Sequence, residues 1–549
     1  MTKPLERFWL LLKPANKEIR QIYTLSLFTG LIALSLPLGV QAIINLIQGG
    51  QISTSFLILI IIVVLGISAA GAMQIVQLRI TENLKQSIFA KAAFDFALRV
   101  PNIKSEEFYR QYAPEIMNRF FDISSVQKGL SKILIDFSNS TLQIIFGLVL
   151  LSLYHPIFIL LSFTVVLIIY IILRYISKLG LETSLLESTQ KYRVSYWLQE
   201  IARAKLTFKM AGKTDLAVRE TDKRTSKYLE AREKHFLVLR QQMIILIGFK
   251  VFVAASLLLI GGILVINQQM NIGQFVAAEL IILLVIGSVE KIILCLETIY
   301  DVLTSLEKIG QVSDLRLENN NIGDVFKTDT PISIEMINVS FAYPLAQKHT
   351  LENINLKIES GEKICISGDN GSGKSTLMKL LSMQYEIKSG NICFNNYPIN
   401  NYNKGTIKQY LGSYINEDTI FNGTIEDNIS VGRENISPID IMKSSEKMYL
   451  LEYLKELPEG LKTKVYSDGQ LLPKSVIQKI LLTRSIVSKP ALILLEDCFE
   501  NIKYSERIRM IDYLLSNEME STVVFICSDS HLIENCKRNI LIEDGKIKN

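Results

Sequence analysis

Nine consecutive residues in the second half of the chain have the types and spacing of a phosphate-binding loop. Small side chains let backbone N–H groups surround phosphates, Lys374 places a point charge on the β- and γ-phosphates, and Ser375 can be a ligand of Mg²⁺. The spacing therefore predicts a site for a nucleoside triphosphate with Mg²⁺. The nine residues are Gly368, Asp369, Asn370, Gly371, Ser372, Gly373, Lys374, Ser375 and Thr376.

A loop of this kind needs a buried parallel sheet to hold it. It follows the apolar run Lys363–Ser367 and precedes the helix-like run Leu377–Met383. Such a loop, with later apolar strands and helices between them, predicts a doubly wound α/β nucleotide-binding domain with its ligand at the carboxyl ends of the strands. We place this domain at residues 331–549. Further strand-like runs are Ile332–Met336, Val339–Tyr343, Ile354–Ile358, Ala491–Leu495 and Thr522–Cys527.

The first 300 or so residues contain very long apolar stretches. Asp, Glu, Lys and Arg are absent between Arg20 and Arg79 and throughout Phe137–Leu173. Because a helix needs about 20 apolar residues to cross a bilayer, we predict an all-α transmembrane domain of six spans at residues 21–310. The spans are Gln21–Ile47, Ser53–Gln77, two within Phe137–Leu173 that part at Tyr154-His155-Pro156, Met243–Ile266 and Gly273–Val289.

The distribution of cations predicts the orientation in the membrane. Lys and Arg are frequent in the N-terminal segment 1–20 and in the long loops 79–131 and 174–240, whereas the short turns between spans have none. Cations favour the cytoplasmic side, so both termini are expected there. This placement accounts for the net charge of +5 without a nucleic-acid partner. Leu5, Phe8, Trp9 and Leu12 predict an interfacial helix in segment 1–20, and no cleavable signal is expected.

Two long loops, a linker and the cysteines complete the organisation. Each loop has a helical pattern with one interruption, near Gln111–Glu115 and near Met210–Lys213. These tips are either contacts for a soluble domain or plain hairpin turns, and both interpretations stay open at this point. Residues 311–330 form a polar, Asn-rich linker. The cysteines lack C-x-x-C spacing and are interpreted as reduced core thiols.

Six spans with long cytoplasmic extensions, followed by a phosphate-loop domain, resemble a half-transporter of the ABC exporter family over nearly the whole chain. The resemblance implies a dimer in which each ATP lies between one chain's phosphate loop and the other chain's signature sequence. It implies that Tyr343 stacks on adenine and that the tips near Pro114 and Gly212 are coupling helices. Pro37–Gln41 and Ile43–Asn45 resemble a bacterial subgroup related to protein- and peptide-secretion exporters, and no leader-peptidase domain is expected ahead of the spans.

Several positions depart from the family pattern. Asn416 stands where the family has Gln, and it is a candidate ligand of Mg²⁺ by resemblance. Leu472-Pro473-Lys474-Ser475-Val476 stands where the family has Leu-Ser-Gly-Gly-Gln. Pro473 removes a donor and a hydroxyl, whereas Lys474 and Ser475 are either phosphate-binding residues or an ordinary solvated surface. Ser467–Gln470 looks similar to a signature but lies too early in the chain, and we reject it.

The expected catalytic positions are altered as well. Glu496-Asp497 stands where the family has Asp-Glu, so Glu496 can hold Mg²⁺ through water while Asp497 is one methylene short of the base that positions water. Misplacement by ~1 Å can lower a rate by about 10²-fold. Ser528 occupies the position of the switch histidine. Slow hydrolysis is therefore expected, with Asp497, Glu496, Ser528 and Asn416 as the candidate catalytic residues.

Three functions remain open. The chain is an exporter subunit, a hydrolytically weak or degenerate regulatory subunit, or a membrane ATP sensor. A homodimer or a heterodimer with another half-transporter, membrane lipid and a periplasmic adaptor protein are the candidate partners, in a bacterial inner membrane. Within the spans, Lys250 is interpreted as snorkelling to the cytoplasmic face, and Glu279 faces either a translocation path or another cavity. The substrate is not indicated by the sequence.

The predicted topology can be checked by labelling. A single cysteine introduced at Gln268 should react with an impermeant thiol reagent added from outside, because this turn joins the last two spans on that side. A cysteine at Asn549 should be protected in intact cells. Labelling of the Asn549 cysteine from outside would contradict the six-span model with both ends inside.

Overall fold

The computed structural model describes the chain except for residues 1–3, 49–53, 111–112, 319–322, 528 and 549. The chain forms two compact units. The first comprises Met1–Pro101 and Gln111–Leu315, and the second comprises Arg316–Asn549 together with Asn102–Arg110. The short segment Asn102–Arg110 thus belongs to the second unit although it lies between two helices of the first.

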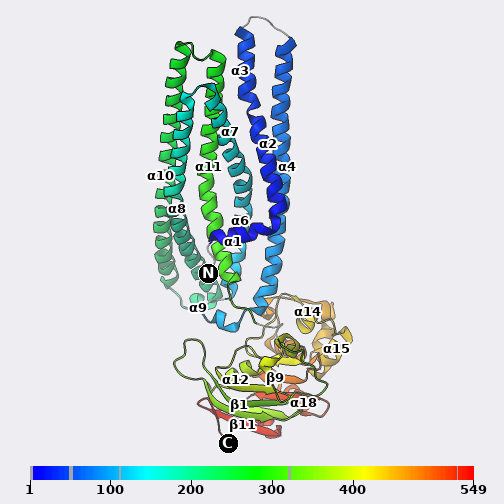
Figure 1. The fold of residues 1–549 in the computed structure, drawn as a ribbon. Helices are drawn as coiled ribbons and strands as arrows, with labels where there is room; N and C mark the ends of the chain where they lie inside the picture. Colours follow the sequence, from blue (N-terminus) through cyan, green and yellow to red (C-terminus); the bar gives the residue numbers. More distant parts are fainter. Residues whose placement is uncertain (1–3, 49–53, 111–112, 319–322, 528, 549) are drawn as a thin grey trace. The chain divides into compact units, whose positions relative to one another are not determined.

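The first unit is entirely helical (Figure 1). Its helices run from the short α1 to α11, and the longest is α10 with 51 residues. A π-helical segment, Lys132–Phe137, joins α6 to α7. The helices are α1 Pro4–Leu12, α2 Asn16–Ala33, α3 Ser35–Gln48, α4 Thr54–Arg99, α5 Ala113–Asn118, α6 Asp122–Ser131, α7 Ser138–Tyr154, α8 Ile157–Arg203, α9 Lys205–Met210, α10 Leu216–Ile266 and α11 Ile272–Ser313.

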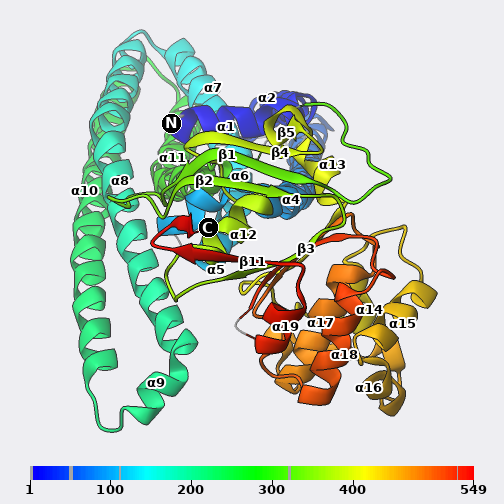
Figure 2. The same ribbon diagram turned by 90° about the horizontal axis from the view of Figure 1, so that it is seen from below.

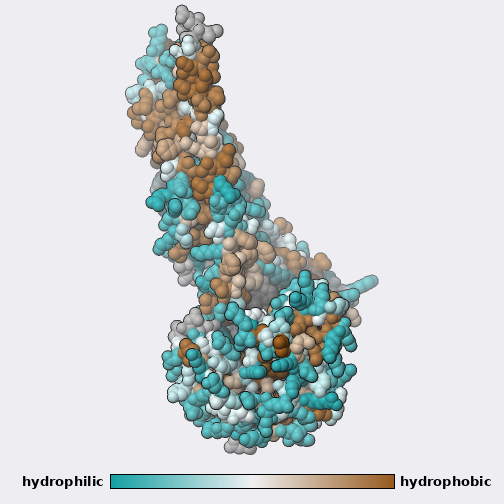
Figure 3. All heavy atoms as spheres, turned by 90° about the vertical axis from the view of Figure 1, so that its right-hand side faces the viewer, coloured by the Kyte–Doolittle hydropathy of each residue, from teal (hydrophilic) through white to brown (hydrophobic). Residues whose placement is uncertain are grey.

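The described helices include five runs that are long and apolar enough to cross a membrane, judged by length and composition. They contain the first five spans expected from the sequence. The sixth expected span, Gly273–Val289, forms the first part of α11, a largely buried helix. On the face shown in Figure 3, apolar side chains gather over the upper part of this unit and hydrophilic side chains over its lower part. The all-α fold class expected for this part of the chain is confirmed.

Two of the expected spans differ in detail from the helices observed. Gln21–Ile47 is not one helix, because α2 ends at Ala33 and α3 begins at Ser35. Pro37 has no N–H to donate to the carbonyl of Ala33, so the helical hydrogen-bond ladder is interrupted there. The helical run that contains the third span also begins well before Phe137, with α6.

Two charged residues within the spans were interpreted from the sequence. The sequence predicts that Lys250 on α10 snorkels, and in the structure its ammonium lies 2.8 Å from a carboxylate oxygen of Glu290 on α11. Pairing with a neighbouring helix satisfies the charge within the protein, and snorkelling of this lysine stays a prediction. Glu279 is partly buried on α11.

The second unit contains two larger sheets and a small β-ribbon. The six-stranded sheet has the order β12-β11-β3-β10-β9-β6, with parallel pairing except between β11 and β12. The four-stranded sheet is antiparallel, in the order β2-β1-β4-β5. The strands are β1 Ile334–Phe341, β2 Leu351–Ile358, β3 Lys363–Ser367, β4 Ser389–Phe394, β5 Tyr397–Pro398, β6 Leu411–Tyr414, β7 Gly423–Thr424, β8 Lys464–Val465, β9 Leu492–Glu496, β10 Thr522–Ile526, β11 Arg538–Glu543 and β12 Lys546–Lys548.

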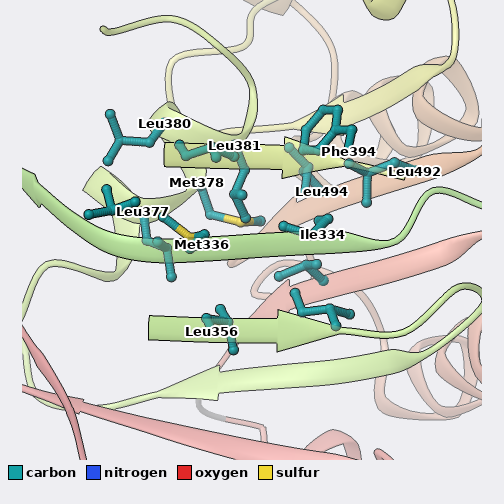
Figure 4. Close-up of a cluster of buried hydrophobic side chains, with 14 of the residues drawn as sticks. Ile334, Met336, Leu356, Leu377, Met378, Leu380, Leu381, Phe394, Leu492 and Leu494 are labelled. Atoms are coloured by element: carbon teal, nitrogen blue, oxygen red, sulfur yellow. The ribbon is translucent and has the colours of Figure 1, made fainter. Parts of the chain in front are cut away.

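Helices surround these sheets, and α14 to α18 gather apart from β1, β2 and β4 (Figure 2). Helix α12 packs between the sheets, where Leu377, Met378 and Leu381 meet strand residues such as Met336 and Leu494 (Figure 4). The expected α/β fold is confirmed. The helices are α12 Lys374–Leu381, α13 Lys404–Lys408, α14 Ile425–Ser430, α15 Pro438–Lys447, α16 Leu451–Glu456, α17 Lys474–Ile486, α18 Tyr504–Leu515 and α19 Ser530–Asn535.

One expected strand boundary is wrong. The sequence predicts Ile332–Met336 and Val339–Tyr343 as separate strands, but the single strand β1, Ile334–Phe341, includes parts of both runs. The strand continues through Asn338, whose φ of 49° is left-handed, and its register shifts there against both neighbours. A bulge of this kind changes which side chains face the core, so the alternation in the sequence breaks although the strand does not.

Helix α1 docks on the last turns of α11 through Arg7. The Arg7 guanidinium donates to the carbonyl of Glu307 at 3.0 Å and pairs with the Asp314 carboxylate at 2.7 Å. It is buried, with 8% of its surface exposed. Gly310 makes room for it, because a Cβ there would lie 1.5 Å from Nη1 of Arg7. Phe8 and Leu12 are buried beside it, while Leu5 and Trp9 are exposed.

This contact generates a stability prediction. Gly310→Ala should lower the melting temperature of the detergent-solubilised protein by several degrees, because the guanidinium must leave charge-assisted hydrogen bonds worth roughly 1.5–3 kcal/mol each. Gly287→Ala on the same helix is the control, since a Cβ there meets no atom within 4 Å. Equal melting temperatures for the two variants would contradict the role given to Arg7.

Candidate functional site

The phosphate loop connects β3 to α12 and depends on glycine for its path. Gly368, Gly371 and Gly373 have φ values of 144°, 84° and 107°. Side chains other than hydrogen are disfavoured at such angles. A Cβ on Gly368 would also lie 2.1 Å from the carbonyl oxygen of Ile542, and one on Gly373 would lie 2.7 Å from Leu351. The loop is therefore held tightly against β11 and β2.

Lys374 begins α12 and folds back over the loop. Its ammonium donates to the carbonyl oxygens of Gly368 at 2.6 Å and Asp369 at 2.8 Å. Ser375 is exposed at the same helix end, and Thr376 is buried beside it. A helix N-terminus with free amide donors and a nearby ammonium attracts phosphate oxygens. The arrangement can bind the phosphate chain that the sequence predicted.

The end of β9 carries a buried carboxylate. Glu496 has no exposed surface, and its Oε2 accepts from the backbone N–H of Asn416 at 3.3 Å. Strands β6 and β9 pair in parallel, which brings Asn416 next to Glu496 although 80 residues separate them. Among the described residues, no hydrogen-bond partner contacts Oε1 of Glu496. A buried anionic oxygen of this kind is costly unless a cation or its water offsets it.

Asp497 follows Glu496 in a left-handed conformation, with φ of 44°. Its N–H donates to the carbonyl of Ile526 at 2.9 Å, so the main chain is fixed by β10. Burial raises the pKa of the Asp497 carboxyl, Glu496 and Glu500 raise it further, and the Lys374 ammonium acts in the opposite direction. The charged form of Asp497 is thus disfavoured where it stands, and a cation beside it would be stabilising. Ser528 lies outside the described residues.

Tyr343 lies just beyond the end of β1, close to the phosphate loop. Its hydroxyl is 3.1 Å from Oγ1 of Thr376. The rings of Phe341 and Tyr385 contact it edge to face, with centroids 5.1 and 5.4 Å away. The structure thereby brings Tyr343 together with the phosphate loop, as the predicted binding role requires.

Pro473 caps the N-terminus of α17 without any side-chain hydrogen bond. Lys474 is exposed and Ser475 is partly buried in its first turn. Ser467–Gly469 forms a separate short turn before Leu471, whose side chain is 90% exposed. Within the described residues, no hydrogen bond or ion pair joins Lys474 or Ser475 to the phosphate loop of the same chain.

The loop after α4 contributes residues to the second unit, which the sequence did not predict. The sequence predicts the tip of that loop near Gln111–Glu115, whereas Asn102–Arg110 joins the second unit. The Lys104 ammonium lies 2.9 Å from a carboxylate oxygen of Glu386, and the backbone N–H of Lys104 donates to the carbonyl of Arg316 at 2.9 Å. The sequence feature that could have predicted this contact segment is the adjacent aromatic pair Phe108-Tyr109 within a charged stretch. The second expected tip, near Gly212, lies in the turn between α9 and α10.

The comparisons with known proteins agree with this arrangement. A family model described as the ABC transporter transmembrane region matches residues 22–289, and one described as ABC transporter matches residues 351–500. A solved "bacterial Atm1-family ABC exporter with ATP bound" is similar with a TM-score of 0.84 and 16% identity, covering 97% of this chain and 95% of that one. This likeness establishes the fold.

Curated relatives show the same family with different cargoes in their names. An ATP-dependent lipid A-core flippase of Desulfotalea psychrophila is 23% identical over 78% of this chain and 74% of its own length. The lactococcin-A transport/processing ATP-binding protein LcnC of Lactococcus lactis subsp. lactis is 25% identical over 79% of this chain and 60% of its own length. A Legionella pneumophila (strain Paris) lipid A-core flippase is 28% identical over 56% of this chain, and the match spans 51% of that relative.

Both matched regions lie in one chain, the transmembrane region ahead of the ATP-binding cassette, as in the exporter whose fold it shares. The chain therefore belongs to the ABC transporter family, as an exporter half-transporter and a multi-pass membrane protein.

Proposed function

We propose that this chain is the subunit of a dimeric exporter in a bacterial inner membrane that binds ATP with Mg²⁺ and uses closure of its nucleotide domains to move the spans. The observation that carries the proposal is the complete phosphate loop, with its three left-handed glycines and Lys374, in the same chain as a helical unit whose described residues include five runs able to cross a membrane. A membrane ATP sensor would need the loop but not so many membrane-crossing helices.

The residues at the carboxyl end of β9 fit a divalent cation. Glu496 presents a buried carboxylate oxygen without a partner in the described structure, and Ser375 offers an exposed hydroxyl at the start of α12. Oxygen ligands of this kind suit Mg²⁺, which keeps several of its waters. Glu496, Ser375 and Asn416 would hold the ion, which would supply charge neutralisation at the phosphates when bound.

The chain's own residues bind and orient the triphosphate better than they support its hydrolysis. Lys374 and the loop amides neutralise phosphate charge, and Tyr343 provides an aromatic face for the base. Asp497 is the remaining carboxylate that can orient water, but it is shorter than the expected glutamate and its main chain is fixed at Ile526. Because its main chain is held there, the Asp497 carboxylate cannot move toward the phosphates to make up for its shorter side chain. We therefore expect slow ATP hydrolysis.

A second candidate function is a hydrolytically weak or degenerate subunit whose ATP-bound dimer is long-lived. The turn Pro473-Lys474-Ser475, exposed at Pro473 and Lys474, favours it, because this helix end lacks the glycines that let a partner's phosphate approach the backbone. In a homodimer both composite sites carry the altered residues. In a heterodimer each site carries some of them, because this chain supplies Asp497 to one site and Lys474 to the other.

The cargo is proposed only at the level of class. One relative is named as a lipid A-core flippase and another as a lactococcin-A transport/processing protein. We therefore propose an amphipathic lipid or a secreted peptide as the substrate class. Glu279, partly buried on α11, is the proposed polar residue of the path. A periplasmic adaptor protein and membrane lipid are proposed partners.

ATP binding should depend on Lys374. Lys374→Ala should weaken binding of ATP–Mg²⁺ by the detergent-solubilised protein at least 100-fold, because it removes the ammonium that folds over the loop. Lys455→Ala, an exposed lysine of α16, should bind ATP as the unsubstituted protein does. Isothermal titration calorimetry measures both, and equal affinity of all three proteins would refute the binding site.

Hydrolysis should be slow and should depend on Asp497. The purified protein in lipid nanodiscs should turn over ATP at less than ~1 s⁻¹, below the ordinary range of enzymes. Asp497→Asn should lower that residual rate at least tenfold, because the amide cannot accept a proton from water. Glu456→Gln is the control, because it removes an exposed carboxylate of α16 that is not among the groups that shift the pKa of Asp497. Turnover above ~1 s⁻¹ that survives Asp497→Asn would show that the altered positions do not limit hydrolysis.

A further inference from the structure

A hollow of about 530 Å³ lies beside Tyr343 within the second unit. It combines residues from two separate parts of the sequence. One group comes from Asn102–Arg110, between the second and third expected spans, and the other comes from the ATP-binding cassette. The lining residues are Ser105, Phe108, Tyr109, Tyr343, Lys379, Tyr385 and Glu417.

Tyr343 is the fixed wall of this hollow. Its hydroxyl is tied to Thr376 at 3.1 Å, and Phe341 and Tyr385 contact its ring at interplanar angles of 83° and 86°. Edge-to-face neighbours of this kind hold an aromatic ring in place and leave a face for stacking. Tyr109 lies parallel to it, with an interplanar angle of 17° and a centroid distance of 6.1 Å.

Tyr109 is the more exposed wall. Half of its surface is exposed, and it lies near the end of a short 3-10 helix, Ser105–Arg110. The start of this segment is anchored, because Lys104 pairs with Glu386 and Glu107 pairs with Arg316. The isolated bridge between Ile103 and Leu317 adds a backbone contact. These anchors thus lie at the start of the segment, and the exposed Tyr109 ring lies near its end.

Resting on the proposed ATP-binding function, we propose that Tyr109 is a second aromatic wall of the nucleotide site, and that the base stacks between Tyr343 and Tyr109. Stacked aromatic atoms lie about 3.5 Å apart, so a base between two rings needs a gap of about 7 Å. The present centroid distance of 6.1 Å is the largest separation that the two ring planes can have, so Tyr109 must move away by at least about 1 Å for the base to enter.

The hollow also offers polar groups to the edge of the base. Lys379 and Glu417 form an ion pair at 2.6 Å on its lining, and together they provide donors and acceptors.

The test compares two ligands on the full-length protein in detergent. ATP–Mg²⁺ has a base, whereas inorganic tripolyphosphate with Mg²⁺ has none. Tyr109→Ala should weaken ATP binding about tenfold or more, since base–aromatic stacking contributes substantially to affinity, and should leave tripolyphosphate affinity within twofold. Tyr109→Phe should bind both ligands as the unsubstituted protein does. Tyr397→Ala, an exposed tyrosine on β5, is the control and should change neither affinity.

Three results would overturn the proposal. Unchanged ATP affinity in Tyr109→Ala would show that the ring does not touch the base. Tighter ATP binding would show that the ring covers Tyr343 and competes with the base. An equal loss for both ligands would show a structural role only. Failure of the proposed ATP-binding function looks different, because the unsubstituted protein would then bind ATP no better than Lys374→Ala does.

Discussion

The phosphate loop lies so close to the β11–β12 hairpin that only glycine fits at its first position. A Cβ on Gly368 would lie 2.1 Å from the Ile542 carbonyl, and the N–H of Gly545 donates to the carbonyl of Ser372 at 3.0 Å. β11 also pairs with β3, so one hairpin fixes both the strand that enters the loop and the loop itself. The direction of the loop amides, the start of α12 and the position of Lys374 all follow from this contact.

The parallel sheet then places the acidic residues beside the loop. β10 lies between β3 and β9, and β6 pairs with the far side of β9. Their carboxyl ends meet at one edge, which is where Lys374, Glu496 and Asn416 come together. The buried Glu496 and the left-handed Asp497 are unfavourable by themselves. Oε1 of Glu496 has no hydrogen-bond partner among the described residues, and the raised pKa of Asp497 disfavours its charged form. Such local costs are typical of binding sites, where the ligand offsets them.

The membrane-spanning unit is built on a different constraint. Backbone polar groups must be satisfied within each helix where water is absent, so long helices follow from the apolar runs. Their irregularities have local causes, such as Pro37 between α2 and α3. The ion pair of Lys250 with Glu290 and the contact of Arg7 with the end of α11 satisfy charges that α10 and α1 cannot satisfy alone. Helix α4 extends far beyond its apolar run and leads into Asn102–Arg110, the segment that belongs to the second unit.

Composition and motif spacing were sufficient to predict a membrane-spanning part followed by a nucleotide-binding domain, because long uncharged runs and a complete glycine-rich loop each depend on local sequence alone. The same holds for the strands β3, β9 and β10, whose continuous apolar residues reflect burial on both faces. β1 was divided in two because its bulge at Asn338 breaks the alternation without ending the hydrogen bonds. Only the tertiary structure decided that Asn416 contacts Glu496, that Lys250 pairs with Glu290, and that Tyr109 lies parallel to Tyr343. Those contacts join residues 80, 40 and 234 positions apart, and no local pattern specifies which distant side chains the packing of sheets and helices brings together.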